Sequence, residues 1–348
     1  MTDHNTYYKR QISLNEVGST GQEKLKESKV LVIGAGGLGS PLLTYLAAAG
    51  VGNITIYDND LVDETNLHRQ ILFDPTDIGK IKSIIAKEKL SKKNPLVKIE
   101  AFTAPFDETA SIDSYDIIVD CTDNLKTKFL AHDMSFQKNK VFCMASIHKF
   151  EGQIQFFNYK QRDKDSPCLR CLWEKRPSDD SIQSCAEAGV IGATAGVIGT
   201  IQASEVIKYI LGLNYLSNNE NLLINLIDFS SFKIKLSKNI DCPLCGNNPK
   251  EISDYKEDFE IDSKSLIDSS YLIVNLTDQK LSFENCIHSS LEAIITDLKD
   301  QRKDKEIAVI CMRGITSIKA VKALRDKGHY NSYSVIGGLN ELRKKEDS

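Results

Sequence analysis

The 348-residue chain is predicted to be an α/β protein with two units, a large one built on a mixed sheet and a small one with its own sheet. Three observations support this prediction. Strand-like and helix-like segments alternate from residue 28 to residue 149, which is typical of a parallel sheet covered by helices. After Glu151 the strands alternate apolar and polar residues, as antiparallel strands do. A polar stretch at 247–256 then precedes a second strand–helix series.

The elements of the large unit follow from local patterns. Apolar runs predict parallel strands at 28–36, 52–60, 97–104, 115–123 and 140–149. Gly and Pro stop signals predict helices at 38–50 and 74–95, the second with an Asp/Pro start, and a third helix is predicted at 124–139. Alternation predicts antiparallel strands at 152–159 and within 222–237.

A further helix is predicted at 188–204, where small residues share one face. They recur at 3-4-3-4 spacing: Gly189, Gly192, Gly196, Gly199 and Ala203. Each glycine costs a helix about 1 kcal/mol relative to alanine. We therefore expect another backbone to approach this stripe closely, and the sheet is favoured over a nucleotide as that neighbour.

The small unit has a simpler pattern. Strands are predicted at 271–278, 306–314 and 331–338, with a helix at 317–328 that stops at a glycine. The predicted domains are residues 1–246 and 257–348, joined by a linker at 247–256.

Composition excludes several classes of function. Charged residues make up 26% of the chain with a net charge of -4, which gives no reason to expect nucleic-acid binding. The polar N-terminus lacks the apolar core of a signal peptide, and the apolar stretch 188–204 is followed by Glu205 and Lys208, so no membrane span is predicted. Nine cysteines in such a chain indicate reduced thiols in the cytoplasm.

The stretch VLVIGAGGLGS predicts a phosphate-binding turn. It places Gly34, Gly36 and Gly39 between a strand and a helix, and Asp58 ends the next strand, where an acid can bond the ribose hydroxyls of a nucleotide. NAD and ATP fit these residues equally well.

Polar residues beyond the turn favour ATP over NAD. A triphosphate needs Arg and Lys to offset its charge and a carboxylate to hold Mg²⁺. The chain offers such groups near the predicted strand ends, at Asn66, Arg69, Lys82, Asp123 and Asn124.

The cysteines suggest a separate metal site. Two C-x-x-C pairs, Cys168 with Cys171 and Cys242 with Cys245, predict one tetrahedral structural Zn²⁺ that joins distant segments; a pair of redox dithiols is the alternative. Cys185 lies in a polar loop just before a predicted helix start, a setting that lowers a thiol pKa.

Ten motifs, in this order, carry a family resemblance: RQISL, GAGGLGS, AAAGVGNITIYDND, TNLHRQ, DCTDN, EGQIQFF, CLRC, CAEAGV, GVIGTIQASEVIK and CPLCG. With them, the chain from about Arg10 to Gly246 resembles the ubiquitin-activating-like adenylyltransferases of molybdopterin and thiamine biosynthesis, the MoeB/ThiF family. The resemblance implies adenylation of the C-terminal Gly-Gly of a small ubiquitin-like sulfur carrier. It also implies ATP contacts from Gly37, Asp58, Asn66, Arg69, Lys82, Asp123 and Asn124.

The same resemblance implies two features that need other chains. Arg10 would reach into the neighbouring subunit's site in a homodimer. Cys185 matches the position at which some members of the family form a covalent link to the carrier.

The C-terminal unit resembles a divergent rhodanese. CMRGITS fits the C-x₅-S frame of the active loop, with Cys311 as the thiol that carries a persulfide. A loop of backbone N–H groups before a helix would stabilise such a sulfur. Three departures favour a docking module as the alternative: Asn275 replaces the usual Asp, NCIHSS replaces His-Ile-Pro-Gly, and Leu342 stands near the usual Trp.

The sequence thus predicts ATP-dependent adenylation of a sulfur carrier, with Mg²⁺ and Zn²⁺ as metals and a sulfur-donating desulfurase as a further partner. Sulfur would then displace AMP, with Cys311 as donor and Cys185 holding or resolving the carrier. An NAD-dependent dehydrogenase and a catalytically inactive binding module are the rival interpretations. The motifs TNLHRQ and DCTDN count against the first, and the presence of Arg10, Arg69, Lys82 and Asp123 in one chain counts against the second.

Overall fold

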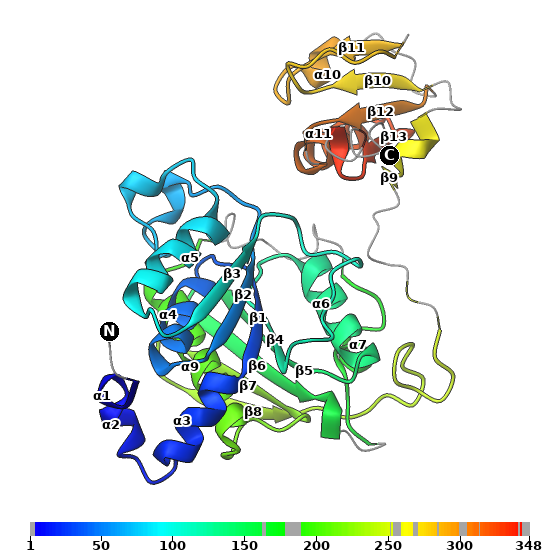
Figure 1. The fold of residues 1–348 in the computed structure, drawn as a ribbon. Coiled ribbons are helices and arrows are strands. Elements are labelled where there is room, and N and C mark those ends of the chain that lie inside the picture. The colour runs from blue at the N-terminus through cyan, green and yellow to red at the C-terminus, as the bar shows by residue number, and fades with distance from the viewer. Residues whose placement is uncertain are drawn as a thin grey trace. The chain divides into compact units, whose positions relative to one another are not determined.

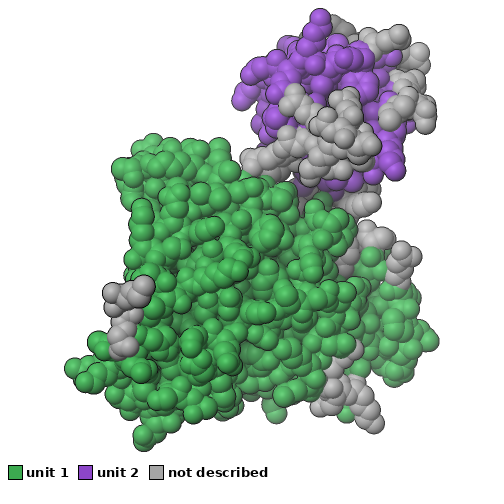
Figure 2. All heavy atoms as spheres, in the orientation of Figure 1, with its two compact units in different colours: residues 1–255 green, residues 256–348 purple. Residues whose placement is uncertain are grey.

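A computed structural model describes residues 4–161, 165–177, 189–250, 252, 259–266, 271–283, 285–298, 305–312, 314–339 and 342. The chain divides into two compact units, residues 1–255 and residues 256–348, which are coloured separately in Figure 2. Among the described residues, no helix combines the length and apolarity that crossing a membrane requires.

The first unit is built on one eight-stranded sheet (Figure 1). Its strands are β1 (Lys29–Ile33), β2 (Asn53–Tyr57), β3 (Lys98–Phe102), β4 (Ile117–Asp120), β5 (Val141–His148), β6 (Glu151–Asn158), β7 (Glu220–Asn225) and β8 (Ser231–Lys235). They follow the order β3-β2-β1-β4-β5-β6-β7-β8. The strands from β3 to β5 pair in parallel, whereas β6, β7 and β8 are antiparallel to their neighbours. This confirms the predicted mixed sheet.

Helices cover both faces of this sheet. They are α1 (His4–Tyr7), α2 (Lys9–Ile12), α3 (Gly18–Glu27), α4 (Gly39–Ala49), α5 (Lys82–Lys93), α6 (Leu125–Gln137), α7 (Leu169–Leu172) and α9 (Gly192–Leu211), with short 3₁₀ helices at Glu64–Asn66, Pro75–Asp77 and Tyr159–Gln161. Successive residues of β1 face opposite sides, because side chains alternate along a strand. Val30 and Val32 pack with α4, α5 and α9, whereas Leu31 and Ile33 pack with α6.

The helix predicted at 74–95 begins later than expected, at Lys82. Asp74 caps only a 3₁₀ turn, Pro75–Asp77, through a capping box with Asp77. Gly79 then has a φ of 81°, which glycine adopts without strain, and it turns the chain before the helix starts. The delay places Lys82 at the first position of α5.

The glycine stripe contacts the start of helix α4 and the loop around His68 more closely than it contacts the sheet. Gly189 precedes α9, with a φ of 75°, so it is not part of the helical stripe. A Cβ atom at Gly199 would lie 2.4 Å from the Leu38 carbonyl oxygen, and one at Gly192 would lie 2.3 Å from the His68 carbonyl oxygen. The prediction of a close backbone neighbour therefore holds, but its preferred identity as the sheet was wrong.

Gly199→Ala is expected to destabilise the first unit by about 1–3 kcal/mol, because the added methyl group clashes with the α4 backbone. Gly196→Ala is the matched control. A Cβ atom at Gly196 meets nothing within 4 Å, so this change should be neutral or stabilise by up to about 1 kcal/mol. Denaturant unfolding of both variants measures the difference, and equal effects would contradict the close packing of α9 on α4.

The second unit contains a five-stranded sheet with the order β11-β10-β12-β13-β9, parallel throughout. The strands are β9 (Glu260–Ile261), β10 (Leu272–Asn275), β11 (Cys286–His288), β12 (Ile307–Ile310) and β13 (Ser332–Val335); the helices are α10 (Ile294–Asp297), α11 (Ile315–Asp326) and a 3₁₀ helix at Ser263–Leu266. The three predicted strands and the predicted helix are present. The two short edge strands and α10 were not predicted from sequence.

Candidate nucleotide site and cysteine cluster

The central parallel strands of the first unit end at a cavity of about 670 Å³. This is the crevice in which open α/β sheets bind ligands. Its lining includes most of the residues that the sequence singled out: Gly34, Gly36, Gly37, Asp58, Arg69, Lys82, Asp123 and Asn124. Asn66 and Gly39 are absent from the lining and act through their neighbours.

The glycine turn follows β1 and starts α4. Gly34 has a φ of 95°, a left-handed conformation that favours glycine. A Cβ atom at Gly39 would lie 2.1 Å from the Gly34 carbonyl oxygen, so only glycine lets the helix start against the turn. Gly36 and Gly37 lie between them in the cavity wall, where a ligand can approach their backbone closely.

Asp58 braces this turn from the end of β2. One carboxylate oxygen accepts a hydrogen bond from the Ala35 amide at 2.7 Å, and the other accepts one from the Asp60 amide at 2.9 Å. Burial raises the pKa of Asp58 above its ordinary value, while the nearby Lys82 ammonium opposes the rise. Asp58 therefore shapes the turn, and its position in the cavity wall remains compatible with a ribose contact.

Two cations belong to the cavity wall. The Lys82 side chain is buried, and its Nζ atom lies 3.2 Å from Asp60 Oδ2. Arg69 is oriented by Asn66, whose Oδ1 atom accepts a hydrogen bond from Arg69 Nη2 at 2.8 Å. The same Oδ1 accepts one from Gln70 Nε2 at 3.2 Å. Asn66 thus positions two residues of the wall, and Gln70 was not singled out by sequence.

The end of β4 supplies the acidic side of the cavity. Asp123 is exposed to the cavity, where its carboxylate is free to meet a metal ion or ligand. Asn124 caps α6, because its Oδ1 atom accepts a hydrogen bond from the Thr127 amide at 2.8 Å. Behind them, Asp120 and Lys128 form an ion pair that was not predicted from sequence. Asp120 lies in the quoted motif DCTDN, but nothing in the motif shows its partner.

Two predicted site residues are not in this cavity. Arg10 lies on α2, is exposed, and does not line the cavity of its own chain. Cys185 falls outside the described residues.

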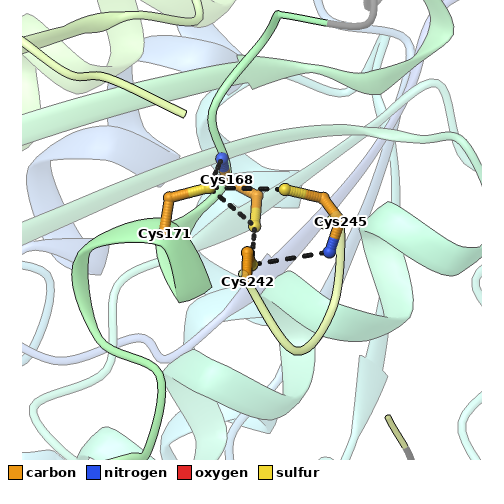
Figure 3. A group of neighbouring side chains, drawn as sticks. All are labelled: Cys168, Cys171, Cys242 and Cys245. Carbon is orange, nitrogen blue, oxygen red and sulfur yellow. Dashed lines mark hydrogen bonds between the residues drawn. The ribbon is translucent and has the colours of Figure 1, made fainter. Parts of the chain in front are cut away.

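The four predicted metal ligands come together as a cluster (Figure 3). Sulfur–sulfur distances are 3.9 Å for Cys168 and Cys171, 3.6 Å for Cys168 and Cys242, and 3.3 Å for Cys171 and Cys245. Tetrahedral Zn²⁺ with Zn–S bonds near 2.3 Å would separate its sulfurs by about 3.8 Å. All four lie within 4.8 Å of one another, so the donor set fits zinc in number, type and spacing.

Hydrogen bonds within the cluster favour the thiolate form of two of its cysteines, Cys171 and Cys242, whereas the pKa values of Cys168 and Cys245 are raised. The hydrogen bond with Cys168 lowers the pKa of Cys242 to about 6, and the pKa of Cys171 is lowered for the same reason. The cluster also joins distant parts of the chain, since Cys168 and Cys171 flank α7 whereas Cys242 and Cys245 follow β8.

Buried polar contacts fasten the first cysteine pair to α6. Arg170 is completely buried; its Nε atom donates to Asp133 Oδ2 at 2.9 Å, and its guanidinium lies 4.6 Å from the Phe129 ring centroid. The Leu169 amide donates to His132 Nε2 at 3.0 Å. These contacts hold the cysteine cluster in place, and they do not involve the nucleotide cavity.

The second unit surrounds Cys311 with hydrogen-bond donors. Cys311 directly follows β12 and is buried, and its Sγ atom accepts from the Gly314 amide at 3.1 Å and the Ser317 amide at 3.3 Å. Ser317 Oγ lies 3.4 Å from the same sulfur. Gly314 is the N-cap of α11, so the sulfur faces the positive end of a helix. Such a cradle stabilises a negatively charged sulfur.

The departures in this unit have structural roles. Asn275 is buried, donates to the Gln279 carbonyl at 2.6 Å and accepts from the Thr277 amide at 2.9 Å. An ionised aspartate could not make the first bond, because it has no donor. Leu342 packs against the core cluster that contains Ile273 and Ile310. Neither residue is one of the hydrogen-bond donors described around Cys311.

The sequence profile of the ThiF family matches residues 8–244, and that of the rhodanese-like domain matches residues 244–345. The chain belongs to the ThiF family. Its motifs, its mixed sheet and its glycine turn agree with that assignment, and the resemblance inferred from sequence is confirmed.

Curated proteins similar to this ThiF-family protein match it over most of their own length. It is 38% identical to the sulfur carrier protein adenylyltransferase of Thermus thermophilus over 72% of this chain and 94% of the relative. It is 32% identical to the adenylyltransferase and sulfurtransferase UBA4 of Lodderomyces elongisporus, over 98% of this chain and 85% of the relative. It is 34% identical to a probable molybdopterin-synthase adenylyltransferase of Porphyra purpurea, over 96% of this chain and 92% of the relative.

Solved structures share the fold of the ThiF domain. E. coli MccB superposes with a TM-score of 0.61 at 22% identity, covering 72% of this chain and 75% of MccB. MccB has also been solved with ATP, with a TM-score of 0.59. At this identity the likeness speaks for the fold alone.

Proposed function

We propose that this protein adenylates the C-terminal Gly-Gly carboxylate of a small ubiquitin-like sulfur carrier and then passes sulfur to it. The observation that carries the first step is the cavity at the ends of the parallel strands. It combines a phosphate-binding turn, the cations Lys82 and Arg69, and the free carboxylate of Asp123. Relatives named as sulfur carrier adenylyltransferases and as adenylyltransferase–sulfurtransferases support the same conclusion.

Adenylation needs positioning and charge neutralisation more than a protein nucleophile. An oxygen of the carrier carboxylate attacks the α-phosphorus of ATP, the bond to the bridging oxygen breaks, and pyrophosphate leaves with the electron pair. Lys82 and Arg69 would offset the phosphate charge, with Arg10 contributed by the other subunit of a homodimer. Asp123 would hold Mg²⁺, which supplies further charge compensation when bound.

Sulfur transfer would use the thiol of the second unit. The terminal sulfur of a Cys311 persulfide attacks the acyl carbon, and AMP leaves. The resulting acyl disulfide is cleaved by the Cys185 thiolate, which releases the carrier thiocarboxylate and leaves a disulfide between the two cysteines for a cellular thiol to reduce. The N–H cradle around Cys311 supports the role of a persulfide carrier. A cysteine desulfurase is the proposed source of the sulfane sulfur.

The proposal also assigns a role to each domain, a metal to the cysteine cluster and a cellular location to the protein. Residues 1–246 would carry adenylation and zinc, residues 257–348 sulfur transfer, and 247–256 the connection. The cysteine cluster would bind Zn²⁺ as a closed structural site, since four protein ligands leave no position for substrate. The thiols fit a cytoplasmic location. Neither the dehydrogenase nor the inactive-module interpretation is favoured by the named relatives.

Carrier-dependent ATP–pyrophosphate exchange tests the adenylation step. The protein is incubated with a panel of Gly-Gly carriers from molybdopterin, thiamine and tRNA-thiolation pathways, and exchange with one of them is expected. Removal of the terminal glycine from that carrier should abolish the exchange. Exchange with none of the carriers would contradict the proposal, and binding of NAD would favour the dehydrogenase.

Cys185→Ala and Cys311→Ala are expected to separate the two steps. Both variants should retain pyrophosphate exchange, because adenylation needs no cysteine, whereas both should lose thiocarboxylate formation from a sulfane donor. Mass spectrometry of the carrier measures the second step. If Cys311→Ala makes thiocarboxylate at the normal rate, the second unit is a docking module and not the sulfur donor.

A further inference from the structure

A buried ion pair lies directly behind the carboxylate that is proposed to hold Mg²⁺. Asp120 ends β4 with no exposed surface, and Lys128, on the second turn of α6, is only 4% exposed. Lys128 Nζ contacts Asp120 Oδ2 and also donates to the Ala145 carbonyl at 2.9 Å. The pair therefore ties α6 to β4 and β5, three residues before Asp123.

The second oxygen of Asp120 holds the turn that carries Asp123. Asp120 Oδ1 accepts a hydrogen bond from Thr122 Oγ1 at 2.6 Å and another from the Thr122 amide at 3.3 Å. From the other side, the Asp120 carbonyl accepts a hydrogen bond from Gln202 Nε2 at 2.9 Å. These bonds leave the residue before Asp123 little freedom to move.

A stability role alone does not account for this arrangement. Taking two charges out of water is costly, and a well-packed apolar pair is often as stable as a buried ion pair. This pair differs from the other buried pair on α6, Asp133 with Arg170, because Lys128 and Thr122 line the nucleotide cavity whereas Asp133 and Arg170 do not.

We propose that the Asp120–Lys128 pair positions Asp123 for its metal ion, through Thr122, and so sets the affinity of the nucleotide site for the metal. Asp120 and Lys128 are positioning residues in this scheme, not metal ligands. Residues that hydrogen-bond to a metal ligand commonly change metal affinity by about 10–100-fold when they are replaced, and a pair that acts through the neighbouring residue is expected at the lower end of that range. The inference rests on the proposed adenylation, since it needs a nucleotide–metal complex in the cavity.

Mn²⁺ binding, followed by electron paramagnetic resonance in the presence of a non-hydrolysable ATP analogue, tests the inference on the full chain. Asp120→Asn should weaken Mn²⁺ binding about tenfold while binding of the analogue in EDTA stays unchanged. Asp133→Asn is the matched control. It breaks an equally buried pair on the same helix, so it should lower thermal stability but leave Mn²⁺ affinity at its original value.

Thr122→Val covers the case in which Asp120→Asn does not fold. It keeps the ion pair and removes only the hydroxyl that links the pair to the turn, and it should also weaken Mn²⁺ binding. Unchanged Mn²⁺ affinity in Thr122→Val, or equal losses in Asp120→Asn and Asp133→Asn, would overturn the positioning role while leaving adenylation intact. If the unsubstituted protein binds no Mn²⁺ with the analogue, the proposed function fails together with the inference.

Discussion

Asp123→Ala is expected to lower carrier-dependent pyrophosphate exchange by at least about a hundredfold, because it removes the carboxylate that holds the metal against the phosphates. The side chain is exposed in the cavity, so its loss should leave the free energy of unfolding nearly unchanged. The variant should therefore lose exchange activity without a change in its thermal unfolding.

The matched control for this variant is Glu108→Ala, which removes an exposed carboxylate outside the cavity and should exchange normally. Titration with Mg²⁺ adds a second measurement, since a weakened metal site should need more Mg²⁺ for half-maximal exchange. Full exchange by Asp123→Ala at low Mg²⁺ would remove Asp123 from the metal-binding role.

Cys168→Ser is expected to cause the largest loss of stability. The protein should contain one zinc per chain, and the variant should lose it and be destabilised by about 4 kcal/mol or more, because loss of a structural metal is among the most costly single changes. Cys168 has no exposed surface, and its sulfur contacts two other sulfurs of the cluster. A ligand from the solvent therefore cannot take the place of the missing thiolate.

Cys143→Ala is the matched control for that variant. Cys143 is equally buried but lies in β5, outside the cluster, so its replacement should retain zinc and cost about 1 kcal/mol. Elemental analysis and thermal unfolding, with and without a chelator, measure both variants. A zinc-free unsubstituted protein that unfolds at the same temperature with the chelator would refute the metal site.

Much of the candidate site could be predicted because its signals are local. Gly34 and Gly39 are recognisable within a few residues of one strand, and each cysteine pair forms its own short motif. The meeting of Cys168 with Cys242 was predictable despite their separation because a tetrahedral ion needs four ligands and each pair supplies two. The alternation in β6 to β8 likewise distinguished antiparallel from parallel strands.

The rest depended on contacts between distant segments. The role of Lys128 could not be recognised from sequence, because its partner Asp120 contacts it only when α6 packs against β4. The start of α5 at Lys82 depended on a capped turn that mimics a helix start. Strands β9 and β11 have two and three residues, too few to show any periodicity. The role proposed for Arg10 involves a second chain, so it cannot be examined within one chain.

The spacing of the cysteine pairs has a consequence for biosynthesis. Cys168 and Cys242 are 74 positions apart, and α9, β7 and β8 lie between them. At about 5–20 residues per second, the first pair waits on the order of 4–15 s after its synthesis before the second pair is made. During that interval its two thiols can oxidise to a disulfide, which would block the cluster. We therefore expect correct assembly of the cluster to need reducing conditions while the chain is being synthesised.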